Sequence, residues 1–105
     1  MYKVTDNQIY ITRGDSAVLN LSIEGYTPAD GDEINFSVKK NCNDRNVLIS
    51  KSIDPTAMTI SITPEDTDSL EFGDYWYDVE LRRAGGVVDT VIVPHNFVVG
   101  AAVTW

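Results

Sequence analysis

The chain has 105 residues, with eight Lys and Arg against 16 Asp and Glu, and a formal net charge of −8. This length suits one domain with an ordinary hydrophobic core, and the acidic balance argues against nucleic acid and anionic membranes, which bind proteins through Lys and Arg. The single cysteine, Cys42, excludes an intrachain disulfide and indicates a reducing compartment.

The N-terminus lacks a basic segment followed by an apolar core, and no stretch approaches the ~18–20 apolar residues of a membrane span. We therefore expect a soluble protein without a signal peptide. Pro and Gly occur singly at turns, and neither a linker nor a repeat is visible. We expect residues 1–105 to form a single domain.

Short runs of β-branched and aromatic residues, separated by turn residues, predict strands in the first part of the chain. In residues 19–23 and again in residues 34–39, apolar and polar side chains alternate, as in half-buried strands. The expected strands here cover residues 8–13, 19–23, 34–39, 47–53 and 58–62. We predict that the last two pair as a hairpin.

Thr63 begins a segment with a capping hydroxyl, a proline at the first helical position and an acid at the third. These features predict a short helical turn through about Leu70, which bridges two sheets. Further strands are expected over residues 75–82, 87–93 and 97–104.

Strands of this kind must bury their apolar face against a second sheet, because the chain offers no long amphipathic helix. The predicted fold is an all-β, immunoglobulin-like antiparallel β-sandwich of about seven to eight strands, with one short helical turn near residues 64–70. Tyr75 begins a long predicted strand after that turn, the longest run of regular alternation in the chain. We predict that it is a tyrosine corner, with its hydroxyl bonded to upstream backbone.

Four segments carry a resemblance to a known family: residues 9–21 (IYITRGDSAVLNL), 31–39 (GDEINFSVK), 62–67 (ITPEDT) and 73–81 (GDYWYDVEL). Together they resemble small tail and baseplate proteins of phages and prophages of Gram-positive bacteria, in particular the N-terminal domain of phage baseplate upper proteins. The resemblance implies a virion component, assembled in the bacterial cytoplasm, that contacts other virion proteins or further copies of itself in a tail, baseplate or capsid.

No arrangement of residues indicates an enzyme, and we predict no cofactor. His95 is the only histidine and is expected in a turn, while Cys42 lies in a polar loop, so neither is placed for nucleophilic catalysis. The tripeptide of residues 13–15 (Arg-Gly-Asp) fits a tight turn.

We also predict no metal site. One Cys and one His cannot fill a tetrahedral zinc site. Acids at residues 30–33 and 65–68 could offer oxygen ligands to calcium, but neither group follows the spacing of a calcium loop.

The C-terminal strands contain more apolar residues than one buried face needs. Either they lie centrally under a covering loop, or one face packs against another protein chain. The predicted interface residues are Trp76, Val88, Ile92, Val98 and Trp105. As an alternative, Trp76 with Asp78 and Glu80 could form an aromatic and acidic platform that binds carbohydrate.

Overall fold

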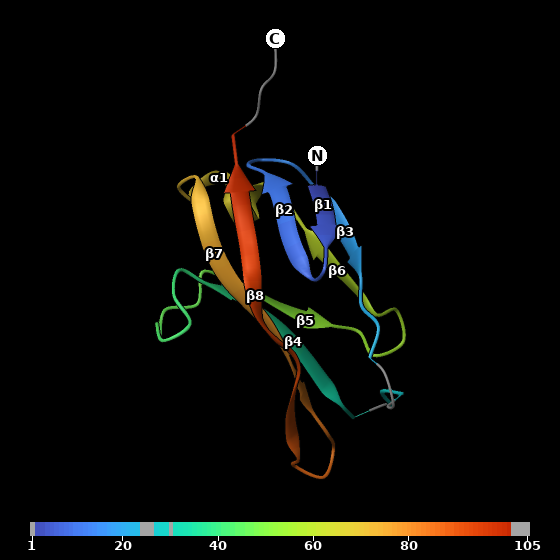
Figure 1. Ribbon diagram of the computed structural model, residues 1–105. Coiled ribbons are helices and arrows are strands. Elements are labelled where there is room, and N and C mark those ends of the chain that lie inside the picture. Colours follow the sequence, from blue (N-terminus) through green and yellow to red (C-terminus); the bar gives the residue numbers. More distant parts are fainter. Residues whose placement is uncertain (1, 24–26, 30, 102–105) are drawn as a thin grey trace.

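The described part of the chain folds into eight strands and one short helix (Figure 1). The structure is a computed structural model that describes residues 2–23, 27–29 and 31–101, without the side chain of Val93. The elements are, in chain order, β1 (Tyr2–Thr5), β2 (Gln8–Thr12), β3 (Ala17–Asn20), β4 (Glu33–Lys39), β5 (Ile49–Ile53), β6 (Thr59–Ile62), α1 (Pro64–Asp68), β7 (Gly73–Arg82) and β8 (Val88–Gly100).

The strands form a six-stranded sheet in the order β1-β2-β8-β7-β4-β5 and a two-stranded sheet of β3 and β6. The predicted all-β sandwich is therefore confirmed. The order β8-β7-β4-β5 opposite β3-β6 corresponds to strands GFCC′ opposite BE in variable-type immunoglobulin domains. One pair, β2 with β8, is parallel, so the large sheet is mixed and not wholly antiparallel as predicted.

Alternating side chains explain why the two layers pack together. On β4, Ile34, Phe36 and Val38 are fully buried, while the residues between them are half-buried on the opposite face. The Phe36 ring lies 5.4 Å from the Tyr77 ring and 6.2 Å from the Phe97 ring, between centroids. Burial of each such side chain contributes about 1.5–3 kcal/mol. This aromatic cluster is the centre of the core.

The predicted hairpin between residues 47–53 and 58–62 is wrong. The first run, β5, pairs with β4 in the large sheet, and the second run, β6, pairs with β3 in the small sheet. The connection crosses between the layers and turns at Met58, whose φ of 53° is left-handed. Alternation of side chains predicts that both runs are strands, but it does not specify the partner of either.

The helical turn is confirmed as α1, which connects β6 of the small sheet to β7 of the large one. Asp66 Oδ2 accepts a hydrogen bond from the Thr63 backbone N–H at 2.8 Å and lies 2.8 Å from Lys51 Nζ. Burial acts to raise the pKa of Asp66, but these hydrogen bonds and the nearby positive charge outweigh it and lower the pKa below its ordinary value. The N-terminus of α1 is thereby attached to β5.

The Arg-Gly-Asp tripeptide forms a tight turn against α1. Gly14 has a φ of 84°, and its N–H donates to Oγ1 of the buried Thr67 at 2.9 Å. The Arg13 guanidinium lies 4.2 Å from the centroid of the Phe72 ring. These contacts give the tripeptide a structural role at this end of the sandwich.

Tyr75 makes the hydrogen bond expected of a tyrosine corner: its hydroxyl donates to the Glu71 carbonyl at 2.8 Å. We expect Tyr75→Phe to lower the free energy of unfolding by about 1 kcal/mol, because the half-buried carbonyl loses its partner while the ring still fills the core. Urea denaturation monitored by tryptophan fluorescence measures this change. Tyr10→Phe is the matched control, since no hydrogen bond of the exposed Tyr10 hydroxyl occurs among the described residues, and an equal loss in both variants would contradict the assignment.

The last predicted strands, over residues 87–93 and 97–104, are one continuous strand in the structure, β8. From Tyr77 to Arg82, β7 advances by five residues, whereas its partner β8 covers seven, from Val88 to His95. The difference reflects two irregularities of the bulge type, which increase strand twist and bend. The end of the β7–β8 hairpin extends away from the sandwich (Figure 1), and the molecule measures 50 × 28 × 24 Å.

Candidate functional site

Two of the predicted interface residues, Trp76 on β7 and Val98 on β8, lie on the solvent-facing side of the six-stranded sheet. Their chain neighbours Tyr75 and Phe97 pair with each other and are buried, so Trp76 and Val98 point to the opposite face. Tyr10 on β2 pairs with Val98 and is 36% exposed. Trp76, Val98 and Tyr10 thus cross three adjacent strands, and we call them the outer-face stripe.

Gly100 has no Cβ and so leaves room for the Tyr10 side chain to lie close to the backbone of β8. A Cβ built on Gly100 would overlap the hydroxyl and ring carbons of Tyr10. The ring therefore lies across the β8 backbone, which only glycine permits at this distance.

Two other predicted interface residues, Ile92 and Val88, lie apart from this stripe. Ile92 faces inward opposite the buried Val79 and packs against the core. Val88 is 50% exposed, but it lies near the end of the projecting hairpin. Trp105 lies outside the described residues.

The bulges in β8 explain the position of Ile92. Simple alternation from Val98 and Asn96 would put Ile92 on the outer face, because all three have even numbers. An irregularity between the pairs Tyr77–His95 and Val79–Ile92 adds one residue to β8 and turns Ile92 inward. A sequence pattern does not reveal such an added residue.

The acidic platform proposed for carbohydrate is partly assembled. Trp76, Asp78 and Glu80 share the outer face, and all three are half-buried. Burial raises the pKa of Asp78 above its ordinary value, repulsion from Glu80 adds to the rise, and the Lys39 charge opposes it. The hollow beside Trp76 has a volume of about 40 Å³. It has room for about one water molecule and does not enclose a sugar ring.

The two potential nucleophile or base side chains occupy different settings. His95 lies within β8 and not in a turn as predicted, and its ring centroid is 6.4 Å from that of Tyr77. Cys42 is exposed in the connection between β4 and β5.

Two of the acidic residues weighed for calcium, Asp32 and Asp66, form contacts with the protein itself. Asp32 accepts hydrogen bonds from the backbone N–H groups of Ala29 and Ala84, at 3.0 and 3.1 Å. Asp66 is bonded to Thr63, and Asp30 lies outside the described residues. Within the ranges that the structure describes, no group of three or more His, Cys, Asp or Glu side chains could hold a metal ion.

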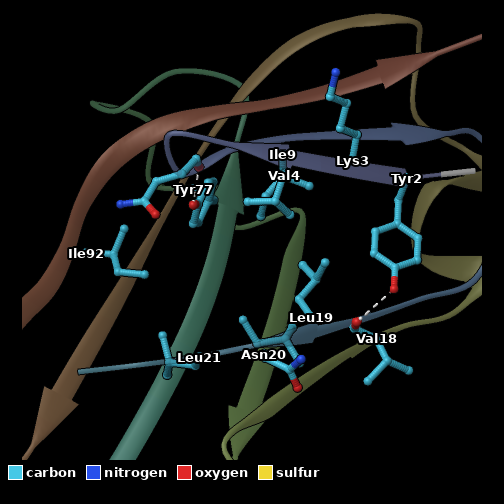
Figure 2. A pocket seen from close by; sticks show the side chains of 12 residues that line it. Tyr2, Lys3, Val4, Ile9, Val18, Leu19, Asn20, Leu21, Tyr77 and Ile92 are labelled. Carbon is cyan, nitrogen blue, oxygen red and sulfur yellow. Dashed lines mark hydrogen bonds between the residues drawn. The ribbon is translucent and has the colours of Figure 1, made fainter. Parts of the chain in front are cut away.

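A second surface, which the sequence does not predict, is a groove where the sandwich is open between β1 and β3 (Figure 2). Its volume is about 370 Å³. Tyr2 and Val4 extend from β1 toward β3, whereas Lys3 points away from it (Figure 2). The groove is lined by Tyr2, Lys3, Val4, Asn7, Ile9, Val18, Leu19, Asn20, Leu21, Ile60, Tyr77 and Ile92. We call it the β1–β3 groove.

Polar contacts hold the two walls of the β1–β3 groove in place. The Tyr2 hydroxyl donates to the Val18 carbonyl at 3.1 Å, which links β1 to β3. The Tyr77 hydroxyl donates to the carbonyl of Asn7, in the turn between β1 and β2. Burial raises the pKa of Tyr77 to about 12, so this hydroxyl stays protonated and able to donate at neutral pH.

One sequence signal could have revealed the first wall of the groove. Residues 2–5 alternate aromatic, basic, β-branched and polar side chains, and Asp6-Asn7 suits a two-residue turn with positive φ. The structure has φ values of 49° and 65° at these positions. The hairpin of β1 and β2 therefore follows from a turn signal that the prediction did not use.

No protein family model matches the chain, and no curated protein or solved structure matches it either. Among the described residues, no helix is long and apolar enough to cross a membrane. The outer-face stripe and the β1–β3 groove are assigned from their geometry.

Proposed function

We propose that the protein is a non-enzymatic structural module of a phage or prophage particle, which acts through protein–protein contacts in a tail, baseplate or capsid. The outer-face stripe is the observation that carries this proposal. Trp and Tyr are enriched at the centres of protein interfaces, where they provide large contact areas at low entropic cost. Trp76, Val98 and Tyr10 offer such an area on the outer face of the sheet.

The place of the module in a virion is supported by the resemblance of its sequence segments to phage tail and baseplate proteins. Self-association or docking on another virion protein would cover the outer-face stripe. Particles purified from a host that carries the gene provide the first test, because the proposal requires the chain to be present in them.

Variants on the outer-face stripe test the contact itself. We expect Val98→Lys to weaken oligomer formation, measured by sedimentation velocity over a wide concentration range, and to reduce incorporation into particles by at least about tenfold, because it puts a charge into an apolar contact. Val47→Lys is the matched control: Val47 is 42% exposed in the β4–β5 connection, and its replacement should change neither. A monomer at every concentration, together with absence from the particles, would rule the proposal out.

Carbohydrate binding is the competing function, since Trp76 and Asp78 share the outer face. A glycan array probed with the protein and with Trp76→Ala separates the two. Signals that disappear in the variant would favour carbohydrate binding, and a blank array would remove it.

A further inference from the structure

We propose that the β1–β3 groove binds an extended, apolar segment of a partner protein, flanked by basic residues, as an added strand beside β3. The site is separate from the outer-face stripe and goes beyond the proposed function, because it states how a partner is held and what chemistry that partner has. It follows from the unpaired edge of the small sheet, the side chains above that edge and the charge around it.

The small sheet has two strands, β3 and β6, and β3 has no partner on its other side among the described residues. Two strands alone are at the limit of stability for a sheet. β1, an edge strand of the large sheet, lies across the groove from β3 (Figure 2). A third strand beside β3 would extend the small sheet into this groove.

The pairing register identifies the backbone groups that face this position. The Leu21 N–H donates to the Met58 carbonyl at 2.9 Å, so the backbone of Leu21 faces β6. In an antiparallel pair every second residue bonds to the same neighbour, so the backbone of Leu19 also faces β6. Val18 and Asn20 therefore direct their N–H and C=O groups toward the groove. The Tyr2 hydroxyl on the Val18 carbonyl agrees with this direction (Figure 2).

β1 and β3 belong to different sheets, and the groove between them has a volume of about 370 Å³. Neighbouring strands lie ~4.7–4.9 Å apart when they are paired directly. Here β1 is linked to β3 through the Tyr2 side chain, whose hydroxyl makes a hydrogen bond to the Val18 carbonyl at 3.1 Å. An entering backbone would replace this hydroxyl at the Val18 carbonyl, and its side chains would lie beneath Tyr2 and Val4.

The lining specifies the side chains of the partner. The groove is lined by apolar and uncharged polar residues and by Lys3, which points away from β3 (Figure 2). A segment with alternating apolar side chains therefore enters without burying a charge. The whole chain has a net charge of −8, and the exposed Asp6 lies in the turn beside the groove. Basic residues beside the apolar segment match this charge.

A synthetic peptide tests the proposal on the intact protein. The probe is an octapeptide of alternating threonine and valine with a lysine at each end, compared with versions that have glutamate ends or a central proline. We expect the lysine-ended peptide to bind most tightly, and the proline version to bind at least about tenfold more weakly because it lacks a ladder donor. Hydrogen exchange measured by NMR should show new protection of the Val18 and Asn20 amides.

Substitutions inside and outside the groove show where on the protein the peptide binds. Val4→Asp puts an acid above the groove, at a residue that is 50% exposed and tolerant of change, and should weaken peptide binding at least about tenfold. Val47→Asp is the control and should bind as the unmodified protein does, as should Val98→Lys on the outer-face stripe. Equal binding by Val4→Asp and Val47→Asp, or no new protection at Val18 and Asn20, would overturn the proposal. Self-association that only Val4→Asp abolishes would also overturn it, since the occupant would then be a second copy.

Discussion

Phe97→Ala is expected to lower the free energy of unfolding by about 3–5 kcal/mol, which is a large part of the total for a domain of this size. Phe97 is fully buried on β8, between β7 and β2, and its ring lies 6.2 Å from that of Phe36. Truncation removes the apolar burial of the ring and leaves a cavity that the paired strands on either side cannot close. The variant is therefore expected to be partly unfolded near 37 °C.

Urea denaturation followed by circular dichroism measures this loss. Val98→Ala is the control, because Val98 is the next residue on the same strand but points to the outer face. It should cost less than about 1 kcal/mol. Similar losses in the two variants would mean that the inward and outward faces of β8 are not as described.

The second large effect concerns Asp32, which is buried although it is an acid. Its two carboxylate oxygens accept hydrogen bonds from the backbone N–H groups of Ala29 and Ala84, and so connect the β3–β4 loop to the β7–β8 hairpin. We expect Asp32→Ala to lower the free energy of unfolding by about 2–3 kcal/mol, since hydrogen bonds to a charged acceptor are stronger than neutral ones.

Hydrogen exchange provides the local measurement. In Asp32→Ala the amides of Ala84 and Gly86 should exchange faster, because the hairpin loses its attachment to the loop. Asp32→Asn keeps one acceptor oxygen and should lose about half as much stability. Glu33→Ala, at the exposed neighbouring acid, should leave both quantities unchanged. Unchanged exchange at Ala84 in Asp32→Ala would contradict the role assigned to this carboxylate.

The sequence predicted those features of the fold that depend on neighbouring residues. Alternation over residues 34–39 and 75–82 reflects side chains that point to opposite faces of one strand, and both segments are strands, β4 and β7. The proline and acids after Thr63 act within a single turn, and α1 begins there. A corner tyrosine depends on a hydrogen bond over four residues, from Tyr75 to Glu71. Local chemistry was sufficient for each of these features.

Features that depend on distant partners were not predictable in the same way. The alternation of β5 and β6 is the same whether they pair with each other or, as they do, with strands of different sheets. The inward position of Ile92 follows from an extra residue in β8, which only the register with β7 reveals. The β1–β3 groove exists because β3 pairs with one strand, β6, in the part of the chain that the structure describes, a property of topology and not of any run of residues.

The parallel pairing of β2 with β8 has a consequence for synthesis of the protein. Residues 9–12 lie beside residues 97–100, so almost the whole chain separates the two members of this pair. On the ribosome, β2 cannot pair with β8 until the residues of β8 have emerged. Contacts between such distant residues also slow folding, and they prolong the time for which the nascent chain exposes apolar surface.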